Sequence, residues 1–183
     1  MINGEKREIG KILAERIQQA PTRPTLGNWV DIRILQNRAV LCALSPGATE
    51  LLYFAGQNIG EGYGRLLEKT NDLQKGLEAY AREVEEKKFA KAEITQVDGE
   101  RAVIQLTENA ATYGLPNLNL KVCAFDAGVQ AGMLAQLIGK RVVSTEVKCY
   151  ANGDSCCEFE IRVISTAEAA FAEAFTPLDE TEP

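Results

Sequence analysis

The sequence of 183 residues contains no histidine, and this absence narrows the chemistry that the chain can perform. Without an imidazole there is no histidine-based catalytic triad or general base, and haem ligation through histidine is excluded. No pair of carboxylates is marked out as catalytic either. The sequence therefore leaves the question of enzymatic activity open and favours a non-catalytic role.

Long hydrophobic runs, a secretory leader and clusters of basic residues are also absent. No stretch approaches 18 apolar residues, and residues 1–17 lack the apolar core of a signal peptide. The 20 Lys and Arg residues are outnumbered by 26 Asp and Glu, so the net charge is -6, whereas phosphate binding needs clustered positive charge. We therefore expect a cytoplasmic protein with no transmembrane segment and no nucleic-acid partner.

Cysteine is present in five copies, four of them between residues 121 and 162. An odd count in a chain long enough to build its own core disfavours a disulfide framework. Three of the thiols and one acid, namely Cys123, Cys149, Cys157 and Glu146, supply four ligands of the kinds that Zn²⁺ accepts, and four protein ligands would make the zinc structural. Reduced core thiols, or a disulfide or redox role for Cys149, Cys156 and Cys157, remain the alternatives.

The pair Asn152-Gly153 predicts a tight turn between two antiparallel strands. On the second strand Cys157 faces the core and Cys156 faces away, because side chains alternate. Cys149 would meet Cys157 if the loop is three residues long. The turn is also expected to donate backbone N–H groups to the sulfurs.

Glu146 stands at an odd offset from Cys149, which would place the two on opposite faces of a regular strand. A β-bulge or a strand end near Val147 is therefore required if both are to bind one ion.

Hydrophobic periodicity and turn signals predict the remaining elements. The sequence reads as helices first and then four strands interrupted by one helix, which defines an α+β fold with an antiparallel four-stranded sheet of two hairpins, covered by helices. The predicted elements are helices at 5–19, 31–44, 48–68, 71–88, 122–138 and 166–175, a hairpin at 92–107 turning at Asp98-Gly99, and the hairpin around Asn152-Gly153.

Glycines are unusually frequent in two of the predicted helices, although each costs about 1 kcal/mol relative to alanine. Two reasons would account for them: close approach of helices, which we favour, or room for a ligand against bare backbone. If the glycines make room for a ligand, the candidate contact residues are Gly56, Gly60, Gly128 and Gly132.

Together these residues resemble the 4-vinyl-reductase (4VR) domain family, which is related in fold to the TRAPP vesicle-tethering subunits and to the sensor half of aromatic-hydrocarbon-responsive activators. Those sensors hold a structural zinc through a cysteine at a helix start, a Glu-x-x-Cys pair and a cysteine eight residues on. Cys123, Glu146, Cys149 and Cys157 match that pattern. The resemblance implies a small-molecule-binding domain of the 4VR type at residues 25–165, between an N-terminal helix and linker at 1–24 and a C-terminal helix and acidic tail at 166–183.

The resemblance implies a non-catalytic sensor or carrier domain for a hydrophobic or tetrapyrrole-like ligand, acting through a partner protein. The hydrocarbon sensors hold a phenolic ligand with a histidine and a tryptophan, but this chain has no histidine and its tryptophan, Trp29, lies far upstream. We therefore do not expect this chain to share the ligand specificity of the hydrocarbon sensors. The alternatives are a homodimeric interaction or assembly subunit without a ligand and, more weakly, an enzyme or chaperone of tetrapyrrole (chlorophyll or bilin) metabolism.

Overall fold

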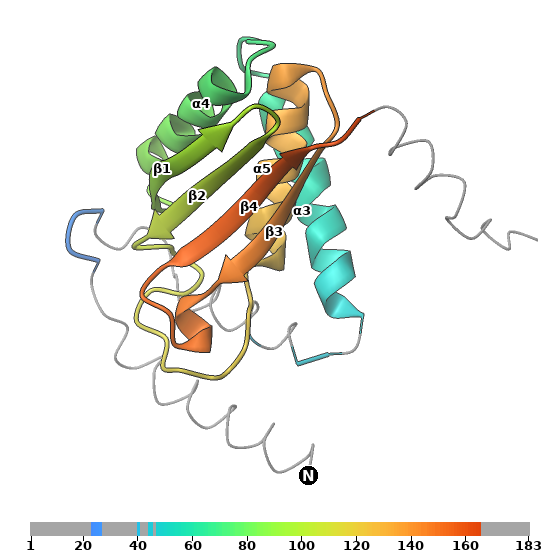
Figure 1. The fold of residues 1–183 in the computed structure, drawn as a ribbon. Helices are drawn as coiled ribbons and strands as arrows, with labels where there is room; N and C mark the ends of the chain where they lie inside the picture. The colour runs from blue at the N-terminus through green and yellow to red at the C-terminus, as the bar shows by residue number, and fades with distance from the viewer. Residues whose placement is uncertain (1–22, 27–39, 41–43, 46, 166–183) are drawn as a thin grey trace, which may run out of the picture.

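The structure, a computed structural model, describes residues 23–26, 40, 44–45 and 47–165, which form one antiparallel sheet with helices on one of its faces (Figure 1). The strands lie in the order β1-β2-β4-β3, so the predicted α+β fold with a four-stranded sheet of two hairpins is confirmed. The elements in chain order are α3 (Ala48–Gly64), α4 (Leu73–Glu86), β1 (Lys91–Asp98), β2 (Arg101–Thr107), α5 (Ala124–Ile138), β3 (Val142–Lys148), the 3-10 helix η1 (Tyr150–Asn152) and β4 (Cys157–Val163).

The predicted helices at 5–19 and 166–175, and nearly all of the one at 31–44, lie outside the described residues, and the division of the chain at residues 24 and 165 stays a prediction. Within the described part of the chain, no helix is both long and apolar enough to cross a membrane.

The first hairpin follows from its turn residues. Asp98 pairs with Arg101, and Gly99 in the two-residue loop has a φ of 57°, which favours glycine. The turn predicted at Asp98-Gly99 therefore occurs, with Gly99 and Glu100 as its loop residues. Along β2 every second side chain is buried against the helices: Ala102, Ile104 and Leu106.

The core lies between the sheet and α5. The inward side chains of β4 are all buried, from Cys157 and Phe159 at 0% exposed to Val163 at 5%. Leu134 and Leu137 of α5 are also fully buried. Because α5 is covered by the sheet on one side and by α3 on the other (Figure 1), nearly all of its residues are apolar or small.

The glycines of α3 and α5 allow the two helices to touch backbone to backbone. A Cβ atom at Gly56 or Gly60 would overlap the carbonyl oxygen of Phe125 or Val129 on α5. The contact is reciprocal, because a Cβ at Gly128 or Gly132 would overlap the carbonyl oxygen of Tyr53 or Gln57 on α3. Close helix packing, the explanation we favoured, therefore accounts for these four glycines.

A short segment before α3, Arg23–Leu26, is held against the end of β2. Arg23 is 1% exposed, and its Nη1 donates to the carbonyl oxygens of Glu108 at 2.9 Å and Phe89 at 3.1 Å. In return the Glu108 carboxylate accepts from the Thr25 hydroxyl at 2.6 Å and from the backbone N–H groups of Thr25 and Leu26, each at 3.1 Å. Although burial raises the pKa of Glu108, the hydrogen bonds from Thr25 and Leu26 outweigh it, so the pKa lies below its usual value.

The hydrogen bonds between the segment Arg23–Leu26 and Glu108 give a first prediction. Glu108→Gln should lower the free energy of unfolding by about 1–2 kcal/mol at neutral pH, because the amide cannot replace three bonds to a charged acceptor. A lowered carboxyl pKa stabilises the native state above the unfolded pKa, and this contribution disappears as the pH falls through the folded pKa. Urea unfolding should therefore show a difference between variant and wild type that shrinks on acidification below about pH 4; a difference independent of pH would contradict the role given to the carboxylate.

Candidate metal centre and adjoining cavity

Three cysteines and one glutamate meet where α5 begins and where β3 and β4 approach their connecting loop. The Sγ atom of Cys123 lies 3.6 Å from that of Cys157 and 3.9 Å from that of Cys149. Together with a carboxylate oxygen of Glu146, the ligand atoms all lie within 4.8 Å of one another. The structure therefore brings together all four residues that the sequence analysis named as zinc ligands.

Each ligand stands at the end or at an irregularity of an element. Cys123 is the N-cap of α5, and Cys157 is the first residue of β4. The pairing of β3 with β4 shifts register between Glu146 and Lys148. The bulge that we required near Val147 is thus confirmed, and it turns Glu146 toward the side on which Cys149 lies.

The two strands around Asn152-Gly153 pair antiparallel as predicted, but the loop between them is longer than the predicted turn of two or three residues. Strand β3 ends at Lys148 and β4 begins at Cys157, and the intervening loop contains η1, which ends at Gly153 with a φ of 92°. The cause lies in a side chain farther on, because Asp154 Oδ2 accepts from the Cys149 N–H at 2.8 Å and holds the wider loop. Cys149 therefore reaches Cys157 without a three-residue turn.

The donors to the sulfurs also differ from those predicted. The N–H groups of Asn152 and Gly153 donate to the carbonyl oxygens of Cys149 and Tyr150. The Cys157 sulfur instead lies 3.1 Å from the hydroxyl of Thr112, and a backbone hydrogen bond from Tyr150 also reaches it.

The thiols divide into one that ionises readily and others that hold their protons. Hydrogen bonds from Cys123 and Cys149, together with that of Thr112, lower the pKa of Cys157. The pKa of Cys123 is raised, first by its hydrogen bonds to the other two sulfurs and then by burial. Burial, and then the neighbouring Cys149, raises the pKa of Glu146 to about 8. Crowded groups that resist carrying several negative charges together are well suited to a divalent cation, which would compensate those charges.

The donor set fits zinc. A tetrahedral ion with Zn–S bonds of about 2.3 Å places two sulfurs about 3.8 Å apart, close to the two separations from Cys123. Glu146 Oε2 accepts from the Cys123 N–H at 2.9 Å, whereas its Oε1 is buried and receives no hydrogen bond from the described residues. A buried carboxylate oxygen without a donor is costly unless it binds a cation.

Among the described residues, one further cysteine, Cys156, is not part of this cluster. Cys156 is 6% exposed and carries a free thiol, but its sulfur is not one of the grouped ligand atoms. Cys42 lies outside the described residues.

An apolar cavity of about 480 Å³ adjoins the cluster. It lies among α3, α4, the end of β2 and α5, and its walls are formed by Leu52, Ile59, Tyr80, Val84, Phe89, Ala90, Leu106, Asn109, Ala110, Ala111, Val122, Phe125, Asp126 and Val129. None of the four glycines that we considered as ligand contacts is in this lining, so the side chains beside them, not bare backbone, form the wall.

One polar connection joins the cavity to the cysteines. Asn109 Nδ2 donates to Asp126 Oδ2 at 2.9 Å and lies 3.9 Å from the Cys123 sulfur. Asn109 and Asp126 both line the cavity, and Val122 beside Cys123 does so as well. The sequence analysis missed Asn109 and Asp126, because an amide in a loop and an acid in the first turn of a helix are ordinary at such positions.

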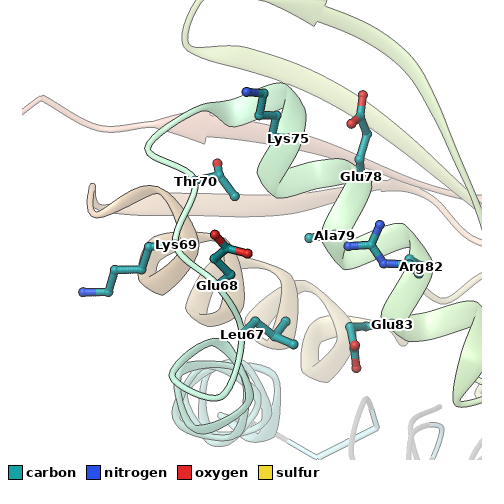
Figure 2. A pocket seen from close by; sticks show the side chains of 9 residues that line it. All are labelled: Leu67, Glu68, Lys69, Thr70, Lys75, Glu78, Ala79, Arg82 and Glu83. Atoms are coloured by element: carbon teal, nitrogen blue, oxygen red, sulfur yellow. The ribbon is translucent and has the colours of Figure 1, made fainter.

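A second hollow, of about 430 Å³, lies between the α3–α4 connection and α4 (Figure 2). Its lining is mostly charged, and Lys69, Lys75, Glu78, Arg82 and Glu83 do not converge on a common point in Figure 2. Mixed charges spread in this way are typical of a solvated surface, so we do not assign a site there.

The described residues have the TRAPP-like α+β architecture, and the cysteine cluster lies where α5 meets the β3–β4 hairpin. Residues 102–163 match the 4VR domain, a segment that contains all four residues of the cluster. The resemblance inferred from the sequence is thereby confirmed.

Particular relatives can also be named. The chain is 27% identical to the uncharacterized protein MJ0150 of Methanocaldococcus jannaschii over 158 residues, which cover 86% of this chain and 90% of the relative. The uncharacterized protein MJ0745 of the same organism is 33% identical over 69 residues, which are 38% of each chain.

Three solved structures share the fold. The phenol-responsive sensory domain of the transcription activator PoxR, solved with phenol, aligns with a TM-score of 0.55 at 14% identity, covering 93% of this chain and 98% of that one. A vinyl-4-reductase family protein from M. jannaschii gives 0.54 at 18% identity, with coverages of 87% and 94%. A trafficking protein particle complex subunit 3 from Naegleria fowleri, covalently bound to palmitic acid, gives 0.51 at 16% identity, with coverages of 90% and 96%.

Proposed function

We propose that this protein is a non-catalytic small-molecule-binding domain, a sensor or a carrier, whose hydrophobic ligand occupies the apolar cavity beside a structural zinc site. The observation that supports the proposal most directly is the position of the cavity, about 480 Å³ in volume, against the cluster of Cys123, Glu146, Cys149 and Cys157. Cavities of this size with mostly apolar walls and few polar groups are typical ligand sites.

Zinc would be bound by Cys123, Glu146, Cys149 and Cys157, and it would supply a cross-link rather than a reactive centre, because four protein ligands leave no position for water. Cys123 anchors the start of α5, while the other three residues belong to the β3–β4 hairpin and its loop. These residues therefore fix the helix start that carries Val122, Phe125 and Asp126 into the cavity wall. A ligand that moves this wall would act on the same hairpin, which gives a sensor a route to its partner.

A small hydrophobic ligand fits this site better than a tetrapyrrole does. Haem and bilins carry carboxylates, and the cavity already presents the carboxylate of Asp126, so anionic side chains would be repelled there. A role as an enzyme or chaperone of tetrapyrrole metabolism is accordingly the weaker proposal. A cytoplasmic location and the absence of a nucleic-acid partner stay predictions from the sequence.

Assembly into a homodimer without a ligand is the second candidate, and one observation favours it. The face of α3 turned away from α5 exposes Leu51 at 71% and Phe54 at 61%, and Leu66, just after the end of α3, is 81% exposed. Apolar side chains gathered on one helix face are typical of an interface.

Mass spectrometry of the full chain under native conditions tests both candidates together. We expect one zinc per chain and a retained small molecule whose mass disappears after denaturation. A homodimer without retained ligand, and without binding of added apolar compounds, would favour the assembly subunit. A chain that holds neither metal nor ligand would contradict the proposed function.

A further inference from the structure

The described residues of the cavity lining form one polar corner in otherwise apolar walls. Among the described residues that line it, only Asn109 and Asp126 contribute an amide or a carboxyl group, and Tyr80 contributes a phenol. No Lys or Arg belongs to this described lining. Among the described lining residues, the one charged side chain is therefore an acid.

The position of that acid is well defined. Asp126 lies in the first turn of α5, and its Oδ2 accepts from Asn109 Nδ2 at 2.9 Å. Asn109 is itself fixed, because it is 4% exposed and its Oδ1 accepts from the Ala111 N–H at 2.9 Å. The carboxyl group is thus held at the wall by a neutral donor, and no Lys or Arg among the described lining residues compensates its charge.

The surroundings add further negative charge. Burial raises the pKa of Asp126 to about 6, against the lowering effect of Asn109, and Glu146 and Cys149 raise it further. With zinc bound, three thiolates and one carboxylate around a divalent ion sum to about -2. An incoming anion would be repelled at this corner, whereas a cation would be attracted.

We propose that the ligand of this cavity is a small primary or secondary amine with an apolar body, whose ammonium group pairs with the Asp126 carboxylate. The inference rests on the proposed function and narrows it to one ligand class. Charge-assisted N–H···O bonds at about 2.7–2.9 Å are among the stronger polar contacts. The apolar body would lie against Leu52, Phe125 and Val129, and the aromatic rings of Tyr80 and Phe125 are also favourable neighbours for a cation.

Four probes of nearly equal size test this choice on the zinc-loaded full chain. They are 1-naphthylmethylamine, 1-naphthalenemethanol, 1-ethylnaphthalene and 1-naphthaleneacetate, which differ only in a cationic, hydroxyl, methyl or carboxylate end. Their naphthalene fluorescence reports binding directly. We expect the amine to bind at least about tenfold more tightly than 1-ethylnaphthalene, and the acetate to bind most weakly.

Asp126→Asn should reduce amine affinity at least about tenfold while leaving the affinity for 1-ethylnaphthalene unchanged. Glu160→Gln is the matched control, because it removes one negative charge on an exposed side chain of β4 that does not line the cavity; it should leave all four affinities unchanged. Zinc content and thermal unfolding show whether Asp126→Asn retains the native fold, and the four-probe comparison on wild type stands without any variant.

The outcomes separate this inference from the function on which it rests. Equal binding of all four probes, or of the alcohol and the amine, would overturn the assignment of an amine and leave small-molecule binding intact. Preference for the acetate would overturn it as well. Failure of every probe to bind the zinc-loaded protein would count against the ligand-binding function itself.

Discussion

Cys157→Ser is expected to abolish zinc binding and to lower the stability of the protein more than any other single substitution in the cluster. Cys157 is 0% exposed, lies 3.6 Å from the Cys123 sulfur, and is the thiol whose neighbours lower its pKa. Structural zinc contributes folding free energy directly, because the unfolded chain does not hold the site. The zinc content should fall from one per chain to nearly none, and Tm should fall by more than about 10 °C.

Cys156→Ser provides the matched control. It makes the same chemical change one residue earlier, at a buried thiol outside the cluster. This variant should keep its zinc and unfold close to wild type, and chelation of the wild type should reproduce the instability of Cys157→Ser. Retention of zinc in Cys157→Ser, with loss in Cys156→Ser, would show that the ligand assignment is wrong.

Gly128→Ala should destabilise the protein by about 2–3 kcal/mol, even though alanine is the better helix former by about 1 kcal/mol. The added methyl group would overlap the carbonyl oxygen of Tyr53 and lie within 2.8 Å of the Gln57 nitrogen. Both are backbone atoms, so no side chain can move aside, and α3 and α5 have to separate. Gly128→Leu should exceed about 4 kcal/mol. Chemical denaturation with the zinc content held constant measures both effects.

Gly62→Ala tests the same residue change without the contact. Gly62 lies within α3, and a Cβ built there meets no atom within 4 Å. This substitution should therefore stabilise the protein by about 0.5–1 kcal/mol, as expected for a helix interior. If Gly62→Ala and Gly128→Ala shifted stability equally, the backbone contact between α3 and α5 would not explain the glycines.

The sequence predicted the elements and the composition of the cluster better than it predicted the local path of the chain. The odd offset between Glu146 and Cys149 was enough to require a bulge, because strand alternation is a strict rule. Asn152-Gly153 was misleading because the turn signal is local, whereas the wider loop depends on the hydrogen bond from the Cys149 N–H to Asp154.

The residues that line the cavity could not be predicted from the sequence, for a different reason. Tyr80, Asn109 and Asp126 come from a helix stripe, a loop and a helix start, and no motif connects them. For the glycines we favoured helix contact over ligand space, but their spacing alone could not separate the two. The choice depends on the register of α3 against α5, which the spacing within either helix does not specify.

The sheet order also has a consequence for the growing chain. β4 is the last of the described strands to be synthesised, yet it lies between β2 and β3 and pairs with both. Until it emerges from the ribosome, β2 and β3 each present an open edge that can recruit another nascent polypeptide. Since β4 begins with Cys157, completion of the four-residue cluster and closure of the sheet would finish in the same step of synthesis.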